Sequence, residues 1–314
     1  MVIELCKIGG TVLALLALLW RVHALGRRHR WQPEWQRKLM HIGLGTTSLT
    51  FPWLFDAIWQ VGAVCGVGAL ILVAVRTVPR LRQSVGSVLH DVPRDSPGEL
   101  LFALAIFLLF ALSHATPVAY VLPLAVLTFA DTAAALVGSH WGRHRYLVLD
   151  GHKSWEGVLA FALVTSGTAL VALRLLTPLT WPTLLLLTLT IAGVGALIEA
   201  ISWRGLDNLL VPLGLYLLLV LLLERNIGFL LYQLLGLSLL AITAQLAPNR
   251  LPLHSVLTAL LTIYCLWLAG PLLWFVGLLT LLLLHTVTAQ WNDSEQRKPL
   301  ELMPMRYWLG PVGL

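Results

Sequence analysis

Long, nearly uninterrupted apolar runs recur along almost the whole chain, and they restrict its possible folds more than any other feature. Leu184–Ile198 and Leu209–Leu223 are two examples. A transmembrane helix needs about 20 consecutive, predominantly apolar residues. The polar stretches between the runs are short, and only 11% of the 314 residues are charged, about half the usual share in soluble domains. The sequence therefore predicts an all-α fold, a polytopic transmembrane helical bundle of about 10 or 11 helices in a lipid bilayer.

The apolar runs also set the expected boundaries of the helices. We place them at 3–20, 39–56, 57–75, 99–115, 117–138, 155–176, 183–201, 208–223, 227–246, 252–269 and 271–288. The first run has some features of a signal peptide, but its charges follow the run, and no small-residue cleavage site precedes Arg21. We therefore expect it to be retained as a transmembrane helix.

The basic residues predict how the bundle is oriented. If the segment Arg21–Lys38 lies in the cytoplasm and each helix crosses once, only Lys7, Arg174 and Arg225 of the 21 Lys and Arg residues fall on the other side. An excess of basic residues marks the cytoplasmic side of membrane proteins. We therefore expect an integral multi-pass protein with its N-terminus outside and its C-terminal tail inside. The net charge of +6 then reflects this orientation, and no nucleic-acid partner is expected.

Five acidic residues lie near the predicted cytoplasmic ends of their helices: Glu99, Asp131, Glu156, Glu199 and Asp207. Ionisable groups in or beside a membrane are costly, so each is a candidate functional group. Charges at helix ends can also simply mark the water interface, and for Glu99 this alternative stays open. It is weaker for Asp131, because further membrane-like residues follow it before Gly138. The cluster predicts a site that is open to the cytosol and borders lipid.

The predicted loop from Gly138 to Gly157 has features of a phosphate-binding segment. Ser154 is the expected N-cap of the next helix, with Glu156 in its first turn. Free backbone N–H groups at a helix start, beside Lys153, favour phosphate binding. A Walker A loop is excluded, because Gly-Lys-Ser/Thr do not follow one another here and no strand is expected before them. The alternative is a basic loop anchored by lipid headgroups.

A second basic cluster lies at the start of the helix expected at 39–56. Arg37 and His41 are four residues apart, and Lys38 and His41 three apart, so on a helix they share one face and can grip phosphate together. Membrane anchoring also explains Arg37 and Lys38. It does not explain the adjacent histidine, which is followed by Gly43 and Gly45.

Together these segments resemble the CTP-dependent polyprenol kinase family, which includes phytol kinase, farnesol kinase and dolichol kinase. The matching elements are RKLMHIG (37–43), SPGELLFALA (96–105), FADTAAALVGSHWGRHR (129–145), GHKSWEG (151–157) and IEAISWRGLDNLLVPLG (198–214). They follow the family's order, and each lies at a predicted cytoplasmic helix end. The resemblance covers roughly residues 30–220.

The resemblance implies a reaction at the cytoplasmic face of the membrane. A prenyl alcohol dissolved in the bilayer, such as phytol, geranylgeraniol, farnesol or a polyprenol, would receive the γ-phosphate of a nucleoside triphosphate. The nucleotide is usually CTP, Mg²⁺ is the expected cofactor, and the products are a prenyl monophosphate and CDP.

The resemblance also implies roles for individual residues. Asp131 and Asp207 are the expected Mg²⁺ ligands, since Mg²⁺ takes hard oxygen ligands and few protein carboxylates. Either can instead accept the proton of the alcohol. Lys153 is expected to hold phosphate as the third catalytic residue. The expected nucleotide- and phosphate-binding residues are Arg37, Lys38, His41, Gly138, Gly142, Ser154, Glu156, Glu199 and Asn208. Of these, Glu156 and Glu199 are expected to orient the cations, and Asn208 to contact the metal or the nucleotide.

The chain extends beyond the part that resembles the family. We divide it into a polyprenol-kinase-like transmembrane domain at 1–224, additional transmembrane helices of unknown role at 225–289 and a cytoplasmic polar tail at 290–314. The last residues, 308–314, resemble the start of another apolar segment, so we interpret the chain as truncated or as part of a longer protein.

The sequence also has features in common with two other classes of membrane protein. A phosphatidate cytidylyltransferase shares the Asp-Thr…Lys-Ser-Trp-Glu-Gly pattern, but the longer closing motif of that family is represented here only by Arg204–Asn208. A transporter would place polar groups near the bilayer midplane, often at broken helices within an internal repeat. The acidic residues here gather towards one side instead, and the sequence has no evident repeat.

Overall fold

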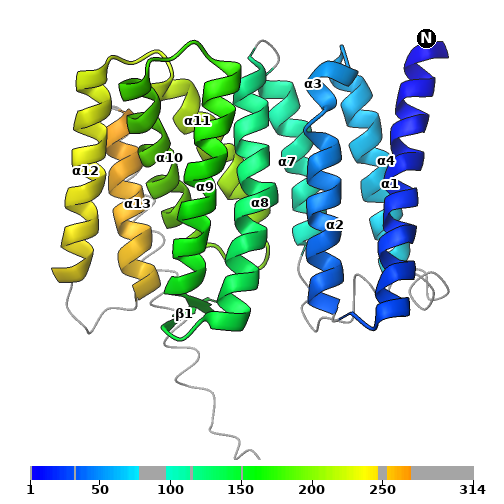
Figure 1. Cartoon of the computed structure of the whole chain (residues 1–314), viewed down its shortest axis with the longest axis horizontal. Helices are drawn as coiled ribbons and strands as arrows, with labels where there is room; N and C mark the ends of the chain where they lie inside the picture. Colours follow the sequence, from blue (N-terminus) through cyan, green and yellow to red (C-terminus); the bar gives the residue numbers. More distant parts are fainter. Residues whose placement is uncertain are drawn as a thin grey trace, which may run out of the picture. The chain divides into compact units, whose positions relative to one another are not determined.

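The apolar segments form α-helices, which satisfy all backbone polar groups within one segment, as a bilayer demands. Figure 1 shows the computed structural model of the chain. It describes residues 2–31, 33–77, 97–113, 116–149, 151–246 and 253–269. The helices are α1 (Val2–His29), α2 (Pro33–Ser48), α3 (Phe51–Leu54), α4 (Ile58–Thr77), α7 (Gly98–Leu112), α8 (Pro117–Trp141), α9 (Trp155–Leu176), α10 (Trp181–Ile201), α11 (Asp207–Leu222), α12 (Ile227–Leu246) and α13 (Leu253–Ala269). The strands are β1 (Arg145–Val148) and β2 (Gly151–Ser154).

Several of these helices have the length and composition of membrane spans. Within the described ranges, five are long and apolar enough to cross a membrane: α1, α4, α8, α9 and α10. The helices α7, α11, α12 and α13 are shorter but also apolar. The predicted fold class, a polytopic helical bundle, is confirmed.

The structure corrects some predicted boundaries near the N-terminus. The segment Arg21–Lys38, predicted as a loop, is mostly helical, because α1 continues to His29 and α2 already begins at Pro33. Arginine and lysine are good helix formers, and proline suits a first turn. The predicted helix 39–56 is wrong in its second half, since α2 ends at Ser48 and α3 follows with Pro52 in its first turn. The predicted helix 271–288 and the tail 290–314 lie outside the described residues.

A β-hairpin stands where the sequence predicted a loop without strands. β1 and β2 pair antiparallel, with Arg145 opposite Ser154 and Val148 opposite Gly151. Gly151 has a φ of 154°, a backbone conformation that glycine adopts without steric cost. The Tyr146 hydroxyl donates a hydrogen bond to the Ala200 carbonyl at 3.1 Å, which fastens the hairpin to the end of α10.

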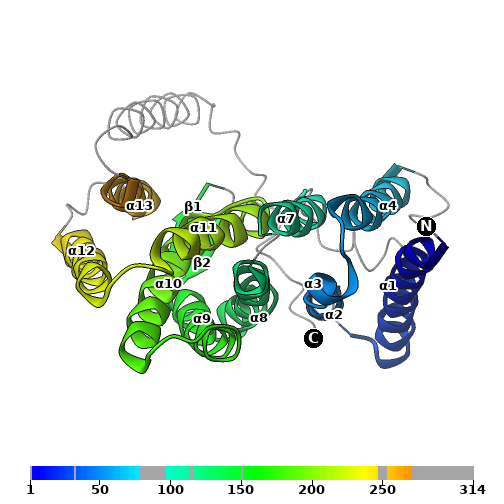
Figure 2. The ribbon, with the colours of Figure 1, turned by 90° about the horizontal axis from the view of Figure 1, so that it is seen from above.

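The helix α8 is central to the part of the bundle that holds the candidate site. It packs against α2, α7, α9 and α11 (Figure 2), and most of its residues from Val118 to Ala134 are buried. By contrast, the buried residues of α1 are Thr11, Val22 and Gly26, and its other side chains are wholly or partly exposed. In lipid such exposed apolar residues are in a favourable environment, so α1 fits a position at the edge of the bundle.

Two glycines allow α2 to lie close to its neighbours. A Cβ atom on Gly43 would meet Leu18 Cδ2 of α1 at 2.5 Å, and one on Gly45 would meet Thr128 Oγ1 of α8 at 2.1 Å. Small residues permit such close helix approach. The glycines that follow His41 therefore have a packing function, which brings the basic face of α2 beside α8.

The chain divides into two units, Met1–Leu261 and Thr262–Leu314. All residues of the candidate site belong to the first unit. This unit also contains α12, which packs against α10. The sequence-based division at 224/225 stays a prediction.

Candidate active site

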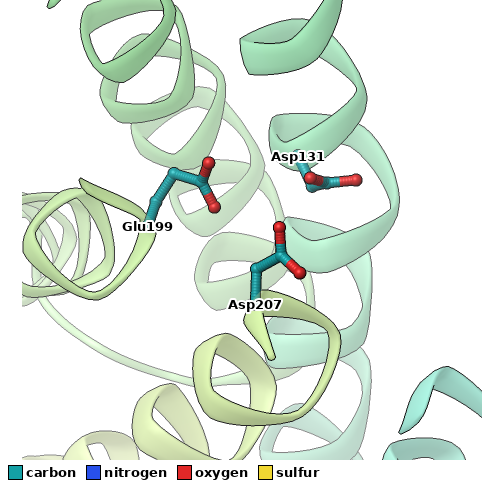
Figure 3. Close-up of side chains that lie close together, drawn as sticks. All are labelled: Asp131, Glu199 and Asp207. Carbon is teal, nitrogen blue, oxygen red and sulfur yellow. The ribbon is translucent and has the colours of Figure 1, made fainter. Parts of the chain in front are cut away.

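Three acidic side chains point toward one another from α8, α10 and α11 (Figure 3). Asp131 lies within α8, Glu199 in the last turn of α10, and Asp207 is the first residue of α11. One carboxylate oxygen of each lies within 4.8 Å of those of the other two. Asp131 and Glu199 are buried, and Asp207 is half-buried. Residues that the sequence placed on three separate helices thus form one cluster.

The turn between α10 and α11 brings Asp207 back beside Glu199. Arg204 and Gly205 have φ values of 49° and 76°, in the left-handed region. Glycine adopts this conformation readily, whereas an arginine there is uncommon and marks a constrained turn. The motif Arg-Gly-Leu-Asp therefore serves to reverse the chain directly before the third carboxylate.

Two lysines compensate most of the negative charge of the cluster. Lys38 Nζ donates a hydrogen bond to Asp131 Oδ2 at 2.8 Å, and Lys153 Nζ donates one to Glu199 Oε1 at 2.6 Å. Lys153 also donates to the backbone carbonyl of Glu199. Burial opposes the charged form of Lys153, but the surrounding carboxylates, Glu199 first and then Asp207, outweigh it and raise the pKa of this lysine. Lys153 is therefore a permanent cation at neutral pH.

The other predicted residues of α2 and α11 also lie at the cluster. His41 Nε2 is 3.6 Å from Asp131 Oδ2 and 3.1 Å from the Leu127 carbonyl oxygen. Arg37 lines the same cavity as these groups. The Asn208 side-chain amide donates to the Gly98 carbonyl at 3.1 Å, so it ties the start of α11 to the start of α7.

The hairpin positions Lys153 through a helix cap and a carboxylate contact. Ser154 is the N-cap of α9, and its hydroxyl accepts a hydrogen bond from the Gly157 N–H at 3.2 Å, which confirms the predicted cap. Glu156 accepts from the His144 backbone N–H at 3.1 Å and lies 2.6 Å from His144 Nδ1. Glu156 thus braces the hairpin, whereas Glu199 is the acid that contacts Lys153. The Trp155 N–H donates to the His144 carbonyl, so part of the expected phosphate cradle at this helix start is already bonded within the protein.

Gly138 and Gly142, both predicted to bind nucleotide or phosphate, differ in their surroundings. Gly138 lines the cavity. A Cβ atom on Gly142 would lie 2.2 Å from the Gly138 carbonyl oxygen and 2.8 Å from Ser154 Oγ, so only a glycine fits between the end of α8 and the cap of α9. The close packing of this corner accounts for Gly142 without a ligand.

A cavity of about 1100 Å³ joins the charged cluster to an apolar region between α1, α2, α4 and α7. Its polar end includes Arg37, Lys38, His41, Asp131, Arg145, His152, Lys153, Glu199, Arg204, Asp207 and Asn208. His152, Trp203 and Arg204 line it although the sequence analysis did not nominate them. The signal was present for all three, because His152 lies in GHKSWEG (151–157), and Trp203 and Arg204 lie in IEAISWRGLDNLLVPLG (198–214), two of the motifs that resemble the family.

The three carboxylates have the properties of a divalent-cation site. Glu199 Oε2 is buried and has no hydrogen-bond partner among the described residues. The lysines that contact the cluster, Lys38 and Lys153, compensate two of its three negative charges. Mg²⁺ is typically held by few carboxylates together with substrate phosphates. The residues present therefore fit Mg²⁺, with Glu199 as a candidate ligand beside Asp131 and Asp207.

Comparison with known proteins identifies one similar protein of named activity. The chain is 39% identical over 183 residues to a phytol kinase of Synechocystis sp., a match that spans 58% of this chain and 76% of that protein. No protein-family model matches the chain, and no solved structure matches it. At this identity and coverage, and with the motifs gathered at one site, the chain belongs to the polyprenol and phytol kinase family, whose members are kinases that act on an alcohol.

Proposed function

We propose that this protein transfers the γ-phosphoryl group of CTP to the hydroxyl group of a prenyl alcohol dissolved in the membrane. The observation that carries the proposal is one continuous cavity with carboxylates and lysines at one end and apolar side chains at the other. Such a cavity suits a substrate with a polar head and a long hydrocarbon tail. The similarity to a phytol kinase supports the same type of reaction.

The chemistry requires a nucleophile, an electrophile and charge compensation. The alcohol oxygen forms a bond to the γ-phosphorus, the bond from that phosphorus to the bridging oxygen of CDP breaks, and the hydroxyl proton passes to Asp131 or Asp207. Phosphoryl transfer depends chiefly on positioning and on neutralisation of the phosphate charges. Lys38 and Lys153, which lie on either side of the carboxylates, are suited to provide fixed positive charge.

Glu199 and whichever of Asp131 and Asp207 does not accept the proton would hold Mg²⁺, which supplies further positive charge at the phosphate oxygens. Arg37 and His41 are suited to bind phosphate from the α2 side of the cavity. Most Lys and Arg residues lie on the same side of the predicted membrane topology as the charged end of the cavity. We therefore assign this end to the cytoplasmic side, where nucleotides are available.

The decisive experiment is phosphate transfer by the purified protein in detergent–lipid micelles. It receives Mg²⁺, each of CTP, UTP and ATP labelled at the γ-phosphate, and a panel of prenyl alcohols. We expect labelled prenyl phosphate from CTP. Asp131→Asn should reduce the rate by about 10²-fold or more, and Glu199→Gln should raise the Mg²⁺ concentration for half-maximal rate by roughly tenfold.

Asp56→Asn is the matched control, because its side chain is 84% exposed, pairs with Lys7 and does not line the cavity. It should retain full activity. If no alcohol is labelled but CTP and phosphatidate together release pyrophosphate, the protein is a cytidylyltransferase and the kinase proposal is wrong. An unchanged Mg²⁺ dependence in Glu199→Gln would limit Glu199 to orienting Lys153.

A further inference from the structure

The cavity has an apolar arm that the phosphoryl-transfer residues do not use. Side chains from four helices form its walls, among them Leu15 of α1, Leu44 of α2, Ile71 of α4 and Ile106 of α7. The lining of this arm is almost entirely hydrocarbon. It has no groups that would bind a nucleotide.

The arm starts directly at the charged cluster. Lys38, His41, Leu44 and Ser48 lie on one face of α2 and all line the cavity, so this face changes from charged to apolar along its length. The His41 ring lies 4.6 Å from the ring of Phe102 on α7. These two rings mark the boundary, and a ligand with its head at the carboxylates has its tail beyond them.

The far end of the arm is closed. Phe51, which is 1% exposed, packs edge-to-face on Phe55 at 5.1 Å, and the Tyr120 hydroxyl donates to the Ser48 carbonyl at 2.9 Å. These residues belong to a buried aromatic and aliphatic core. From Lys38 to Ser48 the helix rises about 15 Å. The arm thus reaches roughly half-way through a hydrocarbon layer of about 30 Å.

We propose that this arm binds the isoprenoid tail of the substrate and that its closed end selects tails of limited length. An isoprene unit adds four carbon–carbon bonds of about 1.5 Å and therefore about 5 Å of extended chain. The arm, about 15 Å long, consequently holds roughly three units. Prenols of this size fit entirely, whereas the tail of a long polyprenol must leave the arm. This inference rests on the proposed kinase function and names the substrate class within it.

Two glycines of α4 offer a matched test. A Cβ atom on Gly68 would meet nothing within 4 Å, and Gly68 lines the cavity, so a larger side chain there occupies the arm. Gly66 is two residues earlier on the same helix and also has open space, but it is exposed on the outside of the bundle. Gly68→Leu and Gly66→Leu therefore make the same chemical change to the same helix, inside and outside the arm.

The experiment measures kcat/KM of the full chain for geraniol, farnesol, geranylgeraniol and a long polyprenol. The wild type should prefer farnesol and geranylgeraniol to the long polyprenol. Gly68→Leu should lower kcat/KM for geranylgeraniol by about tenfold or more relative to geraniol. Gly66→Leu should keep the wild-type order. Gly68→Ala adds a smaller obstruction, serves if the leucine variant fails to fold, and should give an intermediate change in the same direction.

The outcomes separate this inference from the proposed function. If the wild type phosphorylates no alcohol, the kinase function itself fails. If the wild type is active but Gly68→Leu and Gly68→Ala leave the preference for tail length unchanged, or lower the rates for all alcohols equally, the tail does not lie in this arm. A wild type that prefers the long polyprenol would overturn the length limit.

Discussion

Lys38 and Asp131 form a buried ion pair within the cavity wall, with side chains that are 5% and 9% exposed. Two charges removed from water are stable only while they remain paired and hydrogen-bonded. Lys38 therefore stabilises the buried carboxylate, and in the proposed reaction it also presents positive charge to the bound phosphate. Its substitution affects folding as well as catalysis.

We expect Lys38→Met to lower the free energy of unfolding by about 3–5 kcal/mol, because it leaves the Asp131 carboxylate buried and unpaired. Thermal unfolding in detergent micelles, followed by circular dichroism, measures the change. The exposed pair Lys7–Asp56, at 3.2 Å, provides the control, and Lys7→Met should cost less than about 1 kcal/mol.

The double variant Lys38→Met/Asp131→Leu removes both charges and should regain most of the lost stability. If the double variant is as unstable as Lys38→Met alone, the pairing is not the cause. Equal stability of Lys38→Met and Lys7→Met would show that the Lys38–Asp131 pair is exposed to water in solution.

The sequence identified the individual residues of the site better than their relationships. Asp131 and Asp207 were nominated because charges in or beside apolar sequence are costly and demand a function, and Lys153 because it stands beside the free N–H groups of a helix start. The place of Glu199 as third member of the cluster was not foreseen, because it depends on the turn at Arg204 and Gly205. A backbone reversal of this kind has no periodic pattern that reveals it.

At the scale of the element, α2 is the helix that couples packing to the site. One of its faces presents Lys38 and His41 to the cavity, while Gly43 and Gly45 contact α1 and α8. The contact of Gly45 with Thr128 is one helical turn away from Asp131. A change in the α2–α8 distance therefore moves the lysine relative to the carboxylates.

Gly45→Ala should destabilise the protein by about 1–3 kcal/mol, the usual cost of overpacking, and should also reduce phosphoryl transfer. Its new methyl group would lie 2.1 Å from Thr128 Oγ1, too close without a shift of α2. Thermal unfolding and the transfer assay give the two measurements. Gly10→Ala on α1, where nothing lies within 4 Å, should alter neither, and a silent Gly45→Ala would refute the close approach of α2 and α8.

Element boundaries were predicted well where composition changes abruptly and poorly where it does not. The helix expected at 155–176 coincides with α9, since Ser154 begins it with a true cap. The end of α1 was missed because Arg27 and Arg28 were taken to mark a loop, although basic residues continue a helix readily. The hairpin was missed because its strands have only four residues each. Tyr146 and Val148 of β1 favour a strand, but the residues of β2, Gly-His-Lys-Ser, do not.

At the scale of the whole molecule, the orientation in the membrane can be tested directly. In a variant without the native cysteines, Arg143→Cys marks the hairpin side and Glu224→Cys the segment between α11 and α12, and both positions are exposed. A membrane-impermeant maleimide should label Glu224→Cys in intact cells, and Arg143→Cys only after permeabilisation. The opposite pattern would place the charged end of the cavity outside the cytoplasm and contradict the assignment.

The cavity itself is a property of the whole bundle that the sequence could not supply. Leucine and isoleucine side chains that line the apolar arm have the same composition as those that face lipid, because both surroundings are hydrocarbon. Only the spatial arrangement of α1, α2, α4 and α7 distinguishes the two groups. The apolar pattern therefore predicted the bundle but gave no indication of an internal space.

The position of α1 has a consequence for how a substrate arrives. Leu15 and Leu16 of α1 line the cavity, yet few residues of α1 are buried. On this side, therefore, α1 alone separates the apolar arm from the surrounding lipid. Displacing such a helix exposes apolar surface to acyl chains, which costs far less than exposing it to water. An alcohol can then enter sideways from the leaflet in which it is dissolved, without its tail ever crossing water. Supply of this substrate would depend on its diffusion in two dimensions and on its concentration in the membrane, not on its solubility in the cytosol.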